Sequence, residues 1–584
     1  MKSKNQKNQF SCKYEALRAL TLLAGILFIW LCVYNKTTLN SWQFPPQYGS
    51  APNTGDAKFS LTMIKTAMDG HLAPFLSKVQ PNLGAPMQAQ WDDIPMPEQL
   101  LFWGLGRLAG WIGVFPAANF AVLLAYILAG VSFYLVARVL ALDWRYSLVS
   151  GFLFAFTAMA HARMLHHLVI TYYWHIPLAL LVCYWILEGN LKVGSRRFWV
   201  SVAIGVIAGI QNPYFTAMIL QLVCLCALKP FFERNWGVVL SVLAFVFVSL
   251  GAFFCLLIPN IVFSLTHGSN DLAFFRAYRW VEMFALKPLD LFMPPPWHPM
   301  ESLARIGDQY RAGVLVPSEL PPSNYLGVIG ISALGLLIYD TIKKLSSHPP
   351  QRPPVEILGV FYIVAFSIIG GLNGILGVMG FYTLRSSNRF SIFILAIVLL
   401  FAVKRLSGVN FFKRNGLWIA PVLALIGLYD QLPAKAFLND SPAIQKEVRA
   451  DAVFVQKLES SLPAGAIVFQ VPFCPFPEAN YANIPDYEHF RPFLYSKNLR
   501  YSFGHVKGRG FEEWQIALLQ KPLNDVIWEL DKKGFQAIIV YRPAFGENAE
   551  KIVQELQNVT RGRRIDHDLG ILSAIVFNSN PSAR

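Results

Sequence analysis

The sequence predicts an α-helical polytopic membrane protein that carries a C-terminal α/β domain. Three observations support this fold class. Of the 584 residues, 54% are hydrophobic and only 15% are charged, which is far from the composition of a soluble domain. Apolar runs of membrane-spanning length recur as far as residue 431. The remaining residues instead alternate short strand-like and helix-like segments.

About eleven apolar segments qualify as membrane spans, judged against the ~20 residues needed to cross ~30 Å of hydrocarbon. The third, fifth, sixth and tenth are short, which indicates a membrane that is thinned or hollowed on one side. We therefore assign residues 1–433 to a transmembrane domain. The predicted spans are 19–35, 115–138, 147–161, 168–187, 198–211, 214–228, 236–262, 325–342, 355–376, 388–403 and 416–431.

Basic residues gather in the loops on one side of these spans, together with the N-terminus. The positive-inside rule places that side in the cytoplasm. The net charge of +15 is explained by these loops and by anionic lipid, so nucleic acid is not an expected partner. Alternation of the spans places six polar segments on the outer side, where they must share one small face. They are the first loop 36–114, the turns 161–167 and 212–214, the long loop 263–324, the segment around Arg385 and Arg389, and the region 434–584.

The first outer loop carries four aspartates, and three of them, Asp56, Asp92 and Asp93, stand out beside the apolar spans. Helical spacing predicts a short helix over 58–68, with Asp56 at its N-terminus. There the carboxylate could simply accept backbone N–H bonds and complement the helix dipole, so a capping role and a catalytic role are both open. The apolar segment 98–113 predicts a helix lying in the membrane interface before the second span.

A histidine-rich turn follows the third span, with His161, Arg163, His166 and His167. His161 and His166 are five residues apart, which is not the spacing that places two zinc ligands on one helix face. A cluster of imidazole and guanidinium groups fits a phosphate or sugar pocket. It also fits ordinary interfacial anchoring beside an aromatic belt.

Two of the outer segments are basic. The long loop 263–324 contains Arg276, Arg279 and Lys287 ahead of a proline-rich turn, and Arg385 and Arg389 lie four residues apart at the end of a short span. Cationic side chains of this kind bind phosphate or diphosphate, and arginine does so through a bidentate fork. Attraction to lipid phosphates in general is the alternative.

The region 434–584 predicts an α/β domain of about 150 residues. Segments 466–472, 536–542 and 571–577 have the pattern of strands, and 512–520 and 548–559 that of helices. The region contains neither a nucleotide-binding glycine loop nor a Ser/His/Asp signature. We expect it to recognise an acceptor or to cap the membrane site.

Several segments together resemble one family. They are GDAKFSLTMIKTAMDGHLAPF, NLGAPMQAQWDDIPMPEQLLF, QNPYF, KPLDLFMPPPWHP, NYLGVIGI, RSSNRF and YEHFRPFLYSKNLRYSFGHVKGRG. They are similar to bacterial integral membrane proteins of the GT-C glycosyltransferase superfamily, and most similar to the YfhO-like branch, which has a periplasmic C-terminal domain. The resemblance is distributed over nearly the whole chain.

The resemblance implies sugar transfer from a polyprenyl-phosphate donor to a cell-envelope glycan or lipid acceptor at the periplasmic face of the bacterial inner membrane. In that superfamily an acidic residue in the first outer loop is the catalytic base or orients the acceptor, and Asp56 occupies that position. Asp93 matches the aspartate before the proline in the motif of this branch, which leaves Asp92 as an expected surface residue. Metal-dependent members carry a second acidic motif that is replaced here by His161, Arg163 and His166. A divalent metal therefore stays open but is not favoured, and no other cofactor is expected.

The expected chemistry can also be argued from the residues. Inverting transfer needs a carboxylate to take the acceptor proton and cations to hold the departing phosphate. Asp56 would be the base, and Arg279, Lys287, Arg385 or Arg389 could bind phosphate. The competing hypothesis is a lipid-linked glycan transporter or a non-catalytic envelope-assembly protein; the scarcity of charges inside the spans favours the enzyme. Transfer of another phospho-linked group, such as phosphoglycerol, also remains open.

Overall fold

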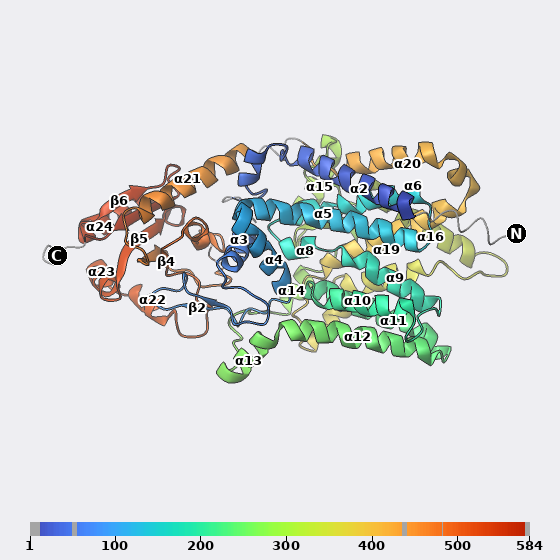
Figure 1. Ribbon diagram of the computed structural model, residues 1–584, viewed down its shortest axis with the longest axis horizontal. Helices are drawn as coiled ribbons and strands as arrows, with labels where there is room; N and C mark the ends of the chain where they lie inside the picture. Colours follow the sequence, from blue (N-terminus) through green and yellow to red (C-terminus); the bar gives the residue numbers. More distant parts are fainter. Residues whose placement is uncertain (1–11, 49–54, 435–440, 480, 482, 579–584) are drawn as a thin grey trace.

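The computed structural model describes residues 12–48, 55–434, 441–479, 481 and 483–578. Figure 1 shows a long bundle of helices with a smaller α/β domain at one end. The first loop, which carries α3 (Gly55–Met68) and α4 (Gln99–Ile112), lies where the bundle and the α/β domain meet. Side chains of this loop can therefore contact both parts of the molecule.

Apolar helices of membrane-spanning length confirm a multi-pass membrane protein. Within the described residues, six helices are long and apolar enough to cross a bilayer, and two shorter apolar helices accompany them. A helix satisfies all its backbone hydrogen bonds internally, which is why long apolar runs take this form in a membrane. The count of eleven spans stays a prediction. The six long helices are α2 (Cys12–Val33), α5 (Val114–Val139), α11 (Pro213–Phe232), α12 (Trp236–Leu256), α19 (Ser391–Gly408) and α20 (Asn410–Gln431), and the shorter two are α9 (His175–Leu187) and α17 (Glu356–Ser367).

Helices α5 and α19 form the centre of the bundle. Of the residues in the most apolar stretch of each helix, 67% are buried inside the protein in α5 and 72% in the span containing α19. In α2 and α20 only 17% of these residues are buried. Gly130 of α5 permits close packing, because a Cβ there would lie 2.9 Å from the carbonyl oxygen of Gly151. The outer helices α2 and α20 consequently leave apolar faces for lipid.

Most of the other helical segments of the bundle are short. Met164 ends α7 with a positive φ of 30°, and the chain turns back there before the next helix. These segments are η1 (Leu39–Gln43), α6 (Trp144–Ala155), α7 (Ala158–Arg163), α8 (Leu168–Thr171), α10 (Arg196–Gly209), α13 (Ile258–His267), α14 (Arg279–Met283), η2 (Pro288–Leu291), α15 (Glu301–Gly313), η3 (Pro321–Asn324), α16 (Gly327–Leu345), α18 (Leu372–Val378) and η4 (Ser387–Phe390).

The two helices predicted in the first loop are present. Helix α3 begins earlier than predicted, so Asp56 lies within its first turn. Helix α4 ends before Gly113, whose φ of 94° separates it from α5. The loop also contains a short antiparallel pair, β1 (Val79–Gln80) and β2 (Ala89–Gln90).

The C-terminal domain is built on one five-stranded sheet in the order β4-β3-β5-β7-β6. Strand β3 is parallel to β4 and β5, whereas β7 is antiparallel to β5 and β6. All three predicted strands and both predicted helices are confirmed. On one face, Leu530 and Val553 from two helices pack against Ile538 and Ile575 of the sheet. The elements are α21 (Ser441–Glu459), β3 (Ile467–Val471), η6 (Glu488–Phe490), η7 (Pro492–Leu494), β4 (Arg500–Tyr501), α22 (Glu513–Leu518), α23 (Leu523–Lys532), β5 (Phe535–Tyr541), η8 (Arg542–Asn548), α24 (Ala549–Thr560), β6 (Arg563–Asp566) and β7 (Leu572–Val576).

Candidate functional site

Asp56 lies on the first turn of α3, at the end of the bundle that faces the C-terminal domain. Its side chain is 37% exposed. Burial by the surrounding protein nevertheless raises the pKa of the carboxyl above its usual range. An accessible carboxyl with a raised pKa is suited to taking up a proton, which is the task of a general base.

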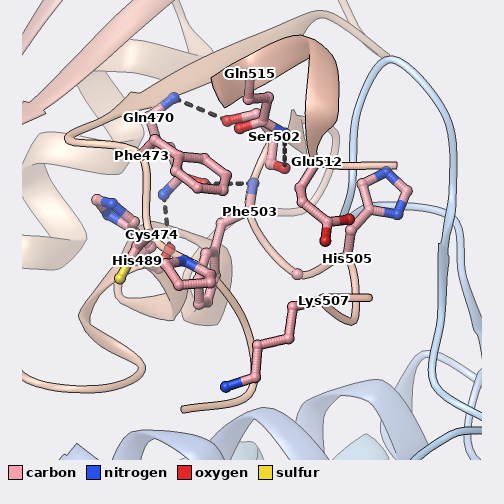
Figure 2. Close-up of a pocket in the computed structure, with 12 residues that line it drawn as sticks. Gln470, Phe473, Cys474, His489, Ser502, Phe503, His505, Lys507, Glu512 and Gln515 are labelled. Atoms are coloured by element: carbon pink, nitrogen blue, oxygen red, sulfur yellow. Dashed lines mark hydrogen bonds between the residues drawn. The ribbon is translucent and has the colours of Figure 1, made fainter. Parts of the chain in front are cut away.

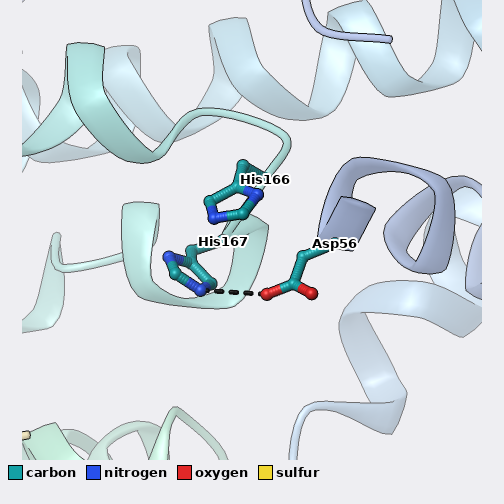
Figure 3. A group of neighbouring side chains, drawn as sticks. All are labelled: Asp56, His166 and His167. Carbon is teal, nitrogen blue, oxygen red and sulfur yellow. Dashed lines mark ion pairs between the residues drawn. The ribbon is translucent and has the colours of Figure 1, made fainter. Parts of the chain in front are cut away.

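The turn after α7 brings two imidazoles to this carboxyl. Thr157 caps α7 by accepting a hydrogen bond from the Ala160 N–H at 3.1 Å, and the reversal after the helix directs His166 and His167 towards α3 (Figure 3). The His167 Nε2 atom lies 3.1 Å from Asp56 Oδ2. The predicted cluster and the predicted base therefore meet, although His167 rather than His161 makes the contact.

The contacts of His167 determine its tautomer. Arg163 Nη1 lies 2.9 Å from His167 Nδ1. A guanidinium group can only donate, so Nδ1 accepts and the ring proton is on Nε2, which donates to Asp56. Burial lowers the pKa of His167 to about 3, so the ring is neutral at pH 7. A neutral imidazole thus holds the carboxylate in place without pairing a full charge with it.

Glu319, which sequence reasoning missed, connects this group to a second arginine. Its carboxylate accepts from Arg163 Nη2 at 3.1 Å, from Arg389 Nε at 2.7 Å and from Arg389 Nη2 at 2.5 Å. Burial alone would raise the pKa of Glu319, but Arg389 and Arg163 more than offset it and hold the pKa well below its usual range. The result is a continuous chain of contacts from Arg389 through Glu319, Arg163 and His167 to Asp56.

Arg385 is a cation in this neighbourhood with no anion of its own. Its guanidinium lies over the rings of Trp280 at 4.9 Å and Phe284 at 5.4 Å, and it has no hydrogen-bond acceptor within the described residues. Burial lowers its pKa, and the nearby Arg276 lowers it further. Arg276 differs, because Glu478 accepts from both of its terminal nitrogens, at 2.9 and 3.0 Å. A half-buried, unpaired arginine is the arrangement expected where a ligand anion binds.

The other predicted residues lie apart from these contacts. His161 is buried against Tyr34, whose hydroxyl is 2.6 Å from His161 Nδ1. Arg279 is exposed beside Trp280, and Lys287 donates to the carbonyl oxygen of Met283 at 2.5 Å. Their assignment to phosphate binding gains no support from these contacts and stays a prediction.

Asp92 and Asp93 of the first loop are both held by cations. Asp93 accepts from Arg509 of the C-terminal domain at 2.8 and 2.6 Å, and no described contact joins it to Asp56. Its catalytic role stays a prediction. The contacts with Arg509 give the same carboxylate a structural role, which is to join the first loop to the C-terminal domain. Asp92 is not the expected surface residue: it is only 2% exposed and lies 3.3 Å from Lys78 Nζ. A buried lysine requires such a carboxylate partner.

Asp56, His166 and His167 could also hold a metal ion. Each offers one ligand atom, and these atoms lie within 4.8 Å of one another. Two imidazoles and a carboxylate form a donor set that a divalent cation such as Zn²⁺ accepts, and His166 Nδ1 is buried with no hydrogen-bond partner in the described structure. The spacing argument against zinc considered His161 with His166, whereas the structure brings together a different set. The residues present therefore fit a divalent ion.

A small cavity lies inside the C-terminal domain (Figure 2). It has room for only about 10 Å³. Its polar groups are largely engaged with one another: the Gln470 N–H donates to Ser502 Oγ at 2.9 Å, and Gln470 Nε2 donates to the carbonyl oxygen of His489 at 2.7 Å. Ligand pockets usually have about 300–1,000 Å³, so this cavity is too small for a sugar.

The chain matches no protein-family profile and no curated protein sequence. Among solved structures, it is similar to ArnT from Cupriavidus metallidurans in the apo state, at 13% identity and a TM-score of 0.40, over 94% of this chain and 98% of that chain. The same ArnT bound to undecaprenyl phosphate gives 12% identity and a TM-score of 0.42, over 98% and 99%. The oligosaccharyltransferase AglB from Archaeoglobus fulgidus, in complex with an inhibitory peptide and a dolichol-phosphate, gives 11% identity and a TM-score of 0.45, over 98% and 75%. Likenesses this weak carry no argument about the function of this chain.

Proposed function

We propose that this protein is an inverting, GT-C-type glycosyltransferase of the bacterial inner membrane. It would move a sugar from a polyprenyl-phosphate donor to a cell-envelope glycan or lipid acceptor at the periplasmic face. The observation that carries the proposal is an accessible, imidazole-held carboxylate, Asp56, at the same end of the bundle as an unpaired cation, Arg385. The charges of Arg389 and Glu478 act on both groups. Both lie at the end of an apolar helical bundle, where a lipid-linked substrate would present its head group. The sequence resemblance supports the same activity.

In the proposed reaction, Asp56 takes the proton of the acceptor hydroxyl. The acceptor oxygen forms a bond to the anomeric carbon while the bond from that carbon to the phosphate oxygen breaks, and the departing polyprenyl phosphate keeps the electron pair. His167 Nε2 orients the carboxylate. Arg385 would bind the phosphate, whose charge grows as it leaves. A phosphate leaving group needs little acid assistance, so one carboxylate is chemically sufficient.

We propose that this chemistry proceeds without a metal. If a divalent ion binds, Asp56, His166 and His167 would hold it, and it would supply Lewis-acid stabilisation of the phosphate. The metal-free form is preferred because His167 already donates to Asp56 and Arg385 already offers positive charge to the phosphate.

An apolar cavity inside the helical bundle supports a lipid-linked donor. It has a volume of about 630 Å³ and is lined by α9, α11, α17 and α19. The guanidinium of Arg389 lies 4.3 Å from the centre of the Tyr214 ring. Tyr214 is in the first turn of α11, and Arg389 comes directly before α19. The cavity residues Leu222 and Ile397 follow them by eight positions, which is about 12 Å along a helix. A polyprenyl chain could therefore extend from a phosphate at Arg385 into this cavity.

The test is a transfer assay in sealed membrane vesicles that contain the full-length protein and polyprenyl-phosphate sugars. We expect glycosylated acceptor and released polyprenyl phosphate in equal amounts. Vesicles made without the protein are the control. Movement of the donor between leaflets with no product would instead support the lipid-linked glycan transporter. Release of an intact phospho-linked group to the acceptor would support transfer of a unit such as phosphoglycerol.

A further inference from the structure

A buried ion pair joins helix α3 to the C-terminal domain. Lys58, two residues after Asp56, has a side chain that is 0% exposed, and its Nζ lies 2.6 Å from Oε1 of Glu488. The other oxygen of Glu488 accepts from Arg491 Nε at 3.1 Å and from Arg491 Nη2 at 3.0 Å. The carboxylate of Glu488 is thus shared between a cation of the first loop and a cation of its own domain.

Arg491 extends this cluster into the rest of the C-terminal domain. It donates to Asp451 of α21 at 2.9 Å, and the same carboxylate lies 3.0 Å from His567 Nε2. Tyr48, which precedes α3 in the chain, also donates to Asp451, at 2.5 Å. The domain therefore holds this part of the first loop both before α3 and on α3 itself.

The position of Lys58 on α3 gives this contact a consequence for Asp56. Residues two apart in a helix point about 200° apart. Asp56 faces His167, so Lys58 points to the opposite side, where Glu488 holds it. Burying an ion pair adds little net stability compared with apolar packing, but it fixes a geometry, because both charges must keep their partners. The pair with Glu488 thus fixes the rotation of α3 about its axis.

The C-terminal domain also contacts the same end of α3 beside Asp56. The Tyr487 ring stacks on Phe59 with centroids 4.8 Å apart, and Tyr487 has a φ of 69°, a conformation that side-chain-bearing residues rarely adopt. Glu478 of the same domain, whose charge acts on Asp56, accepts hydrogen bonds from both terminal nitrogens of Arg276. The domain therefore contacts both the first loop, at Phe59, and the long loop, at Arg276.

We propose that Glu488 and Lys58 are positioning residues of the active site. The C-terminal domain would fix α3 through this pair, so that Asp56 keeps its contact with His167. The proposal assigns the domain a direct part in orienting the base, in addition to any contact it makes with an acceptor. It rests on the proposed function for its catalytic consequence, whereas the anchoring of α3 can be tested without any activity.

The experiment compares wild-type protein with Lys58→Met. This variant leaves Glu488 paired with Arg491, so no buried carboxylate loses all its partners. Lys457→Met is the matched control, because Lys457 makes an exposed pair with Asp568 in the same domain. Three quantities are measured on full-length protein in vesicles: turnover, the number of sites that bind polyprenyl phosphate, and amide hydrogen exchange in α3.

In Lys58→Met we expect turnover per binding site to fall ~10- to 100-fold, the range expected when a catalytic group is misplaced by a small distance. The number of binding sites should stay unchanged, which separates misplacement from partial unfolding. Amide exchange should accelerate in α3 and nowhere else. Unchanged turnover per site together with unchanged exchange in α3 would overturn the proposal.

Two further outcomes remain decisive. If Lys58→Met does not fold, the variant to use is Lys58→Arg, which keeps the charge and changes the length of the side chain. It should show the same fall in turnover per binding site. Full turnover in Lys58→Arg would overturn the positioning role. If wild-type protein shows no transfer at all, the proposed function fails. The exchange of α3 then still decides the anchoring, which fails if α3 exchanges equally in wild type and Lys58→Met.

Discussion

Replacing Arg385 with glutamine should weaken donor binding with little effect on folding. The guanidinium lies over Trp280 and Phe284 at 4.9 and 5.4 Å, and no described residue accepts a hydrogen bond from it. Removing it therefore leaves no protein carboxylate without its partner. A hydrogen bond to a charged group contributes about 1.5–3 kcal/mol, which corresponds to a ~10- to 100-fold loss in affinity.

The assay is competition of polyprenyl phosphate against donor in the vesicle transfer reaction. Arg385→Gln should raise both the KM for donor and the inhibition constant for polyprenyl phosphate by that factor. Arg385→Lys should be intermediate, because it keeps the charge and loses the bidentate fork. Arg305→Gln, which removes an exposed cation of α15 that pairs with Glu301, is the control. Unchanged inhibition by polyprenyl phosphate in folded Arg385→Gln would refute the reasoning.

Three other predictions concern the base, the metal and the cavity. Because burial raises the pKa of Asp56, the base becomes protonated at a higher pH than an ordinary aspartate. Turnover should therefore fall as the pH decreases through that raised pKa. A pH–rate profile that stays flat down to the usual pKa range of aspartate would contradict this. EDTA should leave turnover unchanged in the metal-free mechanism, whereas strong inhibition that added Zn²⁺ or Mg²⁺ reverses would assign Asp56, His166 and His167 to a metal site. Ala365→Trp should fill part of the apolar cavity and raise the KM for long-chain donors several-fold while sparing short-chain analogues, and equal effects on both would place the lipid chain elsewhere.

Membrane physics made most of the bundle predictable from the sequence. Apolar runs in a bilayer form helices, so each predicted span corresponds to helical segments such as α5 and α19. The strands of the C-terminal domain were also predictable, because their apolar patterns are short and bounded by turn residues. The order of those strands was not, since pairing β3 with both β4 and β5 depends on contacts distant in sequence.

The site was predictable only in part. The first-loop position of Asp56 and the convergence of the outer loops correctly brought it near the histidine turn. Glu319 was missed because its role depends on Arg163, 156 residues away, and on Arg389, 70 residues away. An excess of arginines at one face could have prompted a search for a nearby acid. Asp93 shows the reverse difficulty: local sequence cannot distinguish a catalytic carboxylate from one paired with a residue 416 positions away.

The most direct test of the central claim is turnover of Asp56→Asn, measured with the number of polyprenyl-phosphate binding sites. Asparagine keeps the shape and can still contact His167, but it cannot take up a proton. General-base catalysis contributes about 10²- to 10⁴-fold, so turnover per binding site should fall by that factor while binding persists. Asp69→Asn, at the other end of the same helical segment and paired with Lys65, should retain turnover. Full transfer by folded Asp56→Asn would contradict the account.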